Sequence, residues 1–149
     1  MVIGKVRRDR RRGATVVETA LVLLPLLTLL FGIFEYGRLL LDWNLLNNAA
    51  REGCRYALAN NTNITINADV QGVVTSYMAG RNASFTNFTV TVSGTHSGVS
   101  TPVNNLAPGD PITVTVSGKY RFMNIIPLVS MPSLFSLTGS VTMICEGGT

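Results

Sequence analysis

Few side chains in this 149-residue sequence could carry out catalysis. The single histidine, His96, precedes Ser97, and Asp110 follows in the same Gly- and Ser-rich stretch. These are the residue types of a serine hydrolase, but no Gly-x-Ser-x-Gly nucleophile elbow surrounds Ser97. One histidine and eight carboxylates also argue against a metal or acid–base enzyme. We therefore predict that the chain is not an enzyme and has no catalytic, cofactor-binding or metal-binding residues.

The most informative ionisable residue is Glu18, because it lies in an apolar segment. From Ala14 to Phe34 there are 21 residues, and Glu18 is the only charged one. At about 1.5 Å per residue a helix of this length spans roughly 30 Å, the thickness of the hydrocarbon core of a bilayer. The sequence therefore predicts a transmembrane helix over residues 14–35, with the lipid bilayer as its surroundings.

A basic leader at residues 1–13 precedes this segment. Its six basic residues face one acidic residue, Asp9, whereas residues 14–149 carry six basic and seven acidic groups. The positive-inside rule places such a leader in the cytoplasm and the chain after Tyr36 outside the inner membrane. A basic run can also bind nucleic acid. The adjoining apolar segment favours membrane orientation, so we predict no nucleic-acid partner.

The spacing of Gly13 and Glu18 suggests proteolytic processing. Arg-Arg-Gly-Ala at the end of the leader, followed by Glu18, resembles a type IV prepilin cleavage site. A cut after Gly13 makes Ala14 the first and Glu18 the fifth residue of the mature chain. It also creates an amino group in apolar surroundings, where the carboxylate of a neighbouring subunit can neutralise it. The alternatives are an uncleaved anchor and a cleaved secretory signal, although no small-x-small site follows the long apolar core.

The helical pattern continues past the predicted span. Apolar residues recur every three or four positions up to Ala59, which predicts one helix over residues 14–59 with residues 36–59 as its amphipathic extramembrane continuation. Residues 60–149 are rich in Asn, Thr, Ser, Val and Gly and form a small extracytoplasmic domain. In this domain we predict a helix over 69–80, capped by Asn67 or Asp69. We predict three strands, over 88–94, 112–118 and 137–145. Between them we predict a surface loop over 94–111 and an apolar loop over 124–132. A three-stranded antiparallel sheet packed on the long helix gives an α+β fold.

The long helix resembles the TadE-like family, pilin-like proteins of the tight-adherence (Tad/Flp) type IV pilus system. The resemblance rests on residues 14–21, Pro25, 31–38 and the segment Ala-Ala-Arg-Glu-Gly-Cys-Arg-Tyr-Ala at 49–57. It implies a type IV pilin-like fold and a minor pilin or pseudopilin that supports pilus assembly and adhesion. Thr19 after the glutamate, and about 90 residues after the helix, differ from the short major Flp pilins.

The resemblance also implies partners and a location. The partners are a prepilin peptidase, other pilin or pseudopilin subunits and the Tad assembly machinery. The location is the bacterial inner membrane, spanned once with a cytoplasmic N-terminus, and then a pilus at the cell surface. The alternative is an uncleaved, single-pass, membrane-anchored extracytoplasmic binding protein.

The two cysteines, Cys54 and Cys145, are far apart in the sequence. An exported domain meets an oxidising compartment, where disulfides persist. A bridge would close a loop of about 90 residues and stabilise the domain by roughly 4 kcal/mol in the chain-entropy model. We predict this bridge, with two buried free thiols as the alternative.

Overall fold

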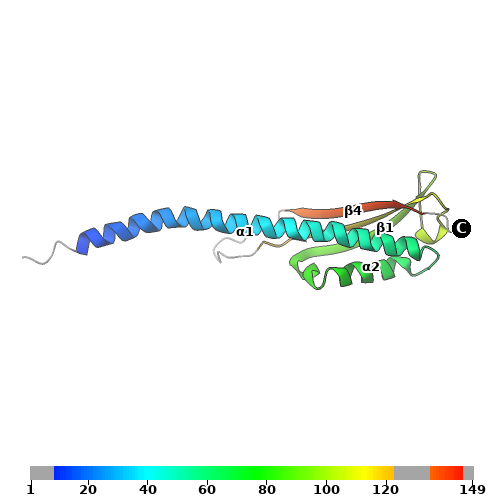
Figure 1. Ribbon diagram of the computed structural model, residues 1–149, viewed down its shortest axis with the longest axis horizontal. Coiled ribbons are helices and arrows are strands. Elements are labelled where there is room, and N and C mark those ends of the chain that lie inside the picture. The colour runs from blue at the N-terminus through cyan, green and yellow to red at the C-terminus, as the bar shows by residue number, and fades with distance from the viewer. Residues whose placement is uncertain (1–8, 123–134, 146–149) are drawn as a thin grey trace, which may run out of the picture. The chain divides into compact units, whose positions relative to one another are not determined.

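The computed structural model describes residues 9–122 and 135–145 (Figure 1). The predicted apolar loop at 124–132 lies outside the described residues. The chain divides into two compact units, residues 1–38 and 39–149. In chain order the helices and strands are α1 (Asp9–Ala59), α2 (Ile66–Tyr77), η1 (Arg81–Ser84), β1 (Phe85–His96), β2 (Val99–Thr101), η2 (Val103–Asn105), β3 (Pro111–Tyr120) and β4 (Ser136–Ile144).

Helix α1 supplies the first unit and the first element of the second. Its 51 residues continue through Pro25 and end at Ala59, where the prediction placed the end. It begins at Asp9, five residues before the predicted start at Ala14. Among the described residues α1 is the one helix long and apolar enough to cross a membrane, and its apolar window is fully unburied. This exposure fits a lipid-facing helix, since the buried core helix of a soluble domain would be covered by protein.

The second unit contains an antiparallel sheet with the strand order β2-β1-β3-β4. Its central register pairs Val90 with Val116 and Val92 with Val114, which confirms that these valines share one face. The predicted α+β fold is confirmed, but the predicted number of strands is too small. The strand that was not predicted is β2, which pairs with the end of β1. A turn at Ser97 and Gly98, both of which have positive φ, joins the two strands. Strand β2 lies in the stretch predicted to be entirely loop.

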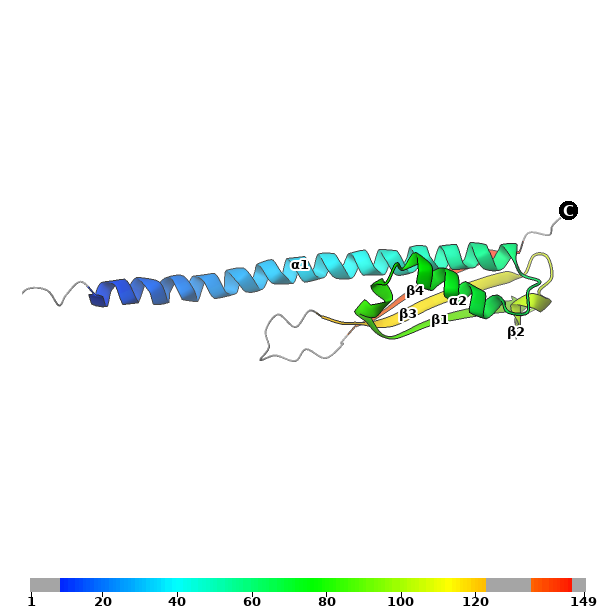
Figure 2. The same ribbon diagram turned by 90° about the horizontal axis from the view of Figure 1, so that it is seen from below.

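The second-unit part of α1 and helix α2 lie on the same face of the sheet (Figure 2), and the buried Val114 and Val116 show that this is the valine face. A Cβ atom built on Gly53 of α1 would come within 2.7–3.4 Å of Val74 and Val70 of α2 and of Val114 of β3. A Cβ atom on Gly139 of β4 would come within 2.8 Å of the backbone of Leu46. Glycine therefore lets β4 approach α1 at backbone distance. The fully buried side chains of this core are Leu46, Ala49, Ala50, Cys54, Ala57, Val70, Val74, Met78, Ile112, Val114, Val116 and Tyr120.

Helix α2 is three residues out of register with the prediction, which placed it at 69–80. It starts at Ile66 because a polar network shapes the preceding turn. The Oδ1 atom of Asn63 accepts from the backbone N–H of Thr65, and Oδ2 of Asp69 accepts from the side-chain amide of Asn63. The Thr65 hydroxyl lies within hydrogen-bond distance of both of these oxygens and can donate to either. Asp69 is thus in the first turn of the helix and does not cap it. Gly80, with φ of 83°, follows the helix in the left-handed region, where glycine is favoured.

Candidate functional site

The predicted processing residues lie together on the first unit of α1. Gly13, Ala14 and Glu18 are all exposed. Ala14 and Glu18 are one helical turn apart, so both lie on one face of the helix. Among the residues that the structure describes, the Glu18 carboxylate has no hydrogen-bond or ion-pair partner. A carboxylate within the hydrocarbon of a bilayer costs a few kcal/mol unless it is paired. The assembly role of Glu18 stays a prediction.

The hydroxyls of the predicted span are satisfied within the helix. Thr19 donates to the backbone carbonyl of Thr15 at 2.8 Å, and Thr28 donates to that of Leu24 at 2.8 Å. Such bonds let threonine sit in hydrocarbon without an unsatisfied donor. At the C-terminal end of the predicted span, Arg38 and Glu35 form an i, i+3 ion pair at 3.5 Å. The first unit therefore has Glu18 near one end and a charge pair at the other.

An ion pair that the sequence did not predict joins Asp42 of α1 to Arg81 of η1. Asp42 is fully buried, and its Oδ1 atom accepts from Nε of Arg81 at 2.9 Å and from a second guanidinium nitrogen. Its other oxygen, Oδ2, is buried without a partner among the described residues. The signal available in the sequence was a lone aspartate on the apolar stripe of a helix. Its partner is 39 residues away, which no spacing rule could indicate.

The two predicted disulfide residues are brought to the same part of the core. Cys54 is fully buried and Cys145 is 3% exposed, and both thiols are free in the structure. The Cys54 thiol donates to the carbonyl of Ile112 at 3.5 Å. Burial raises the pKa of Cys54, and Cys145 is close enough to raise it further. Because the thiolate is the reactive form, Cys54 reacts slowly while the core is closed. The bridge stays a prediction.

His96 and Asp110 also meet, at the far end of the sheet from Asp42. The Nδ1 atom of His96 lies 2.7 Å from Oδ2 of Asp110, and the same oxygen accepts from the backbone N–H of Ala107 at 2.7 Å. Desolvation acts to raise the pKa of Asp110, but these two hydrogen bonds outweigh it and lower the pKa below its ordinary value. Ser97 lies beside His96 in the turn to β2. Among the described residues, Ser97 makes no hydrogen bond to His96. The His96–Asp110 pair joins the loop before β3 to the end of β1.

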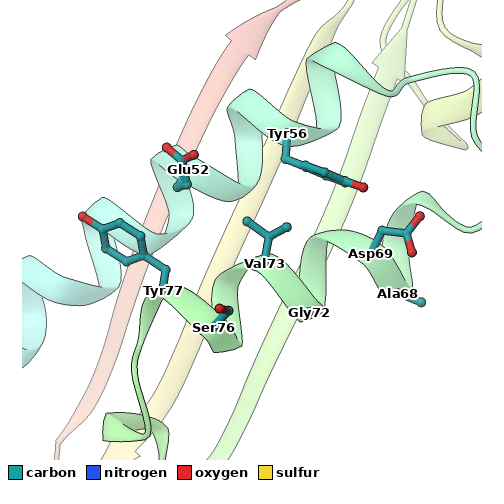
Figure 3. Close-up of a pocket in the computed structure, with 8 residues that line it drawn as sticks. All are labelled: Glu52, Tyr56, Ala68, Asp69, Gly72, Val73, Ser76 and Tyr77. Carbon is teal, nitrogen blue, oxygen red and sulfur yellow. The ribbon is translucent and has the colours of Figure 1, made fainter.

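A surface hollow of about 570 Å³ lies between α1 and α2 (Figure 3). Both carboxylates that line the hollow already have polar partners. Glu52 forms an ion pair with Arg55 at 3.7 Å, and Asp69 accepts a hydrogen bond from Asn63 in the turn before α2. Within the described ranges, no three His, Cys, Asp or Glu side chains gather in a way that could hold a metal ion. The residues that line the hollow are Glu52, Tyr56, Ala68, Asp69, Gly72, Val73, Ser76 and Tyr77.

Comparison with known proteins bears on the helix alone. Residues 13–55 match a family model described as TadE-like protein. No curated protein and no solved structure matches the chain. The match confirms the resemblance of the long helix to the TadE-like family, and it fits a membrane component related to the Tad pilus. It begins at Gly13 and includes Glu18, Asp42 and Cys54, while the sheet lies outside it.

Proposed function

We propose that this protein is a minor pilin or pseudopilin of a Tad-type pilus, cut by a prepilin peptidase after Gly13 and required for pilus assembly and adhesion. The observation that supports this most is the family match over residues 13–55 on an unburied apolar helix. Between Ala14 and Phe34 that helix carries one charged residue, Glu18, five residues after Gly13. The proposal includes no catalysis by the chain itself.

Hydrolysis of the Gly13–Ala14 peptide bond leaves a carboxylate on the leader and a new α-amino group on Ala14. That amine is protonated near neutral pH and is costly in apolar surroundings unless it is paired. Glu18 of an adjacent subunit supplies the opposite charge when two helices lie side by side with a small axial offset. In this proposal the pair stabilises assembled subunits over isolated ones, because each charge lacks a partner before assembly.

The proposed topology follows from the charge of the leader. Residues 1–13 stay on the cytoplasmic side of the inner membrane, and the second unit lies outside. The proposed partners are the prepilin peptidase, other pilin or pseudopilin subunits and the Tad assembly machinery. The adhesive role belongs to the assembled pilus at the cell surface.

Intact-mass spectrometry of the protein from bacterial envelopes tests the processing step. We expect a mature chain that starts at Ala14, and we expect Gly13→Val to retain the leader. Gly32→Val is the matched control, because Gly32 is also an α1 glycine with open space around it. A wild-type chain that keeps residues 1–13 would contradict the proposal and favour the uncleaved anchor.

A second test separates membrane insertion from assembly. Glu18→Ala removes a charge from the apolar segment, so insertion should be unchanged or improved. Pilus assembly should be lost or reduced, because the Ala14 amine loses its partner. Thr19→Ala is the control, since the Thr19 hydroxyl bonds only within its own helix in the described structure. Normal piliation by Glu18→Ala at wild-type protein levels would refute the assembly role.

A further inference from the structure

The second unit has an end that α1 enters from the predicted span, and we call it the span-side end. Its position follows from a series of contacts. Asp42, in the first turn of this unit, binds Arg81 of η1. The carbonyl of Ser84, at the end of η1, accepts from the backbone N–H of Arg121 at 3.1 Å, and Tyr120 donates to the carbonyl of Phe135 at 2.9 Å. The end of β3 and the start of β4 therefore belong to the span-side end.

Aromatic rings are concentrated at this end. Four ring pairs form a continuous row with centroid separations of 5.3–6.4 Å, and the five rings are Phe88, Phe85, Tyr120, Phe122 and Phe135. The row runs from buried to exposed, since Tyr120 is fully buried and Phe135 is 53% exposed. On α1 the single tryptophan, Trp43, is 45% exposed, and Leu41, two residues earlier in the helix, is 54% exposed. Large apolar side chains thus reach the surface next to the point where the helix leaves the domain.

The charges of the second unit are separated along its length. Three of its five basic residues, Arg81, Lys119 and Arg121, lie at the span-side end. The carboxylate described at this end is Asp42, which is buried against Arg81. Asp69 and Asp110 lie toward the other end of the unit, near the start of α2 and the start of β3. The span-side end is therefore cationic as well as aromatic.

We infer that the span-side end is a lipid-docking surface that binds the anionic phospholipid headgroups of the membrane crossed by α1. Exposed Trp and Phe side chains enter the interfacial layer, where aromatic residues are enriched, and the exposed Lys119 adds to the net positive charge that attracts anionic lipid. The surface follows the apolar helix directly along the chain, since Leu41 comes three residues after the end of the first unit. This inference rests on membrane anchoring and does not depend on processing or on a pilus.

A tryptophan moved to the docking surface tests this inference in the full-length chain. Trp43→Phe removes the native fluorophore, and Phe135→Trp then places one tryptophan at the span-side end. The protein is reconstituted into vesicles of equal parts phosphatidylglycerol and phosphatidylcholine, brominated near the headgroup end of the acyl chains. We expect the fluorescence at position 135 to be quenched, and quenched less in vesicles of phosphatidylcholine alone.

The matched control places the tryptophan at Val99 of β2, which is 66% exposed at the opposite end of the sheet. The strand rise puts it about 25 Å from the start of β4, out of reach of lipid quenchers. Phe122→Trp serves if the exchange at 135 unfolds the domain, which circular dichroism detects. Equal quenching at 135 and 99 in the reconstituted protein would overturn the inference while leaving the processing proposal untouched.

Charge variants test the headgroup contribution. Lys119 is exposed at the end of β3, and Lys119→Gln should lower the ratio of docked to undocked domain about fivefold in the anionic vesicles. Arg51→Gln removes an equal charge from an exposed position further along α1 and should leave the ratio unchanged. The same loss in both variants would show a general charge effect and refute a lipid site at the span-side end.

Discussion

Removing Arg81 should destabilise the second unit, because it leaves the Asp42 carboxylate buried without its cation. Breaking a buried ion pair from one side costs about 3–5 kcal/mol. Arg81 is 39% exposed, whereas Asp42 is completely covered. Water can therefore enter where the guanidinium was and solvate part of the carboxylate. We expect Arg81→Ala to lower the free energy of unfolding by about 2 kcal/mol, below the range for a fully buried pair.

Thermal unfolding of the full chain in detergent micelles measures this loss. A domain of just over 100 residues loses about 4 °C of Tm per kcal/mol, so Arg81→Ala should lower Tm by about 8 °C. Trp43 is adjacent to Asp42 in the sequence, and its fluorescence reports this region directly. The control is Arg55→Ala. Arg55 is 72% exposed and pairs with Glu52 at 3.7 Å, so its loss should cost less than about 0.5 kcal/mol.

A double-mutant cycle decides whether the effect comes from the pair. Asp42→Asn alone removes the buried charge and leaves Arg81 partly solvated, so it should cost less than Arg81→Ala. Combined with Arg81→Ala, it should recover part of the loss, because no uncompensated charge remains. Costs that add within about 0.5 kcal/mol would refute the reasoning and reduce Arg81 to a packing residue.

Three further predictions concern the rest of the second unit. Gly139→Ala should cost about 1–3 kcal/mol in chemical denaturation, because its Cβ meets the α1 backbone, whereas Gly72→Ala in α2, with open space around it, should be neutral or stabilising. The stabilisation due to the lowered pKa of Asp110 is complete above its ordinary value of 3.8 and is lost as the pH falls through the lowered value. The Tm difference between wild type and Asp110→Asn should therefore shrink in acid. Non-reducing peptide mapping of envelope protein should recover Cys54 and Cys145 joined, and free thiols there would rule the bridge out.

The long helix was predictable because its signals are local. An apolar run, a three- and four-residue stripe and the Asn-rich stretch after Ala59 set its extent, and its end is correct. The alternation in β1 and β3 likewise predicted which valines face the core. The start at Asp9 was missed because the predicted cleavage point was taken as the helix boundary. Helix formation depends on the backbone and does not stop at a protease site.

The remaining errors come from interactions that a linear sequence does not show. The register of α2 depends on the side chains of Asn63, Thr65 and Asp69 bonding to one another, and any of several polar residues could have started that helix. The strand β2 is three residues long, too short for an alternation to register. The Asp42–Arg81 pair needs the folded unit to bring α1 and η1 together. The roles of Gly13 in processing and Glu18 in assembly stay predictions, and the sequence could not show that the Glu18 side chain would be exposed in the structure.

The two parts of α1 are built from different residues because they have different neighbours. In the first unit the large apolar side chains are exposed, as Leu21 is at 74%, which suits packing against lipid or another helix. In the second unit small residues such as Ala49 and Ala50 are fully buried and let the sheet approach. Every described core residue of the second unit lies at or after Asp42. The proposed cleavage after Gly13 therefore removes none of these described core residues, so in that proposal the charge at the start of the span changes while the described core of the second unit stays complete.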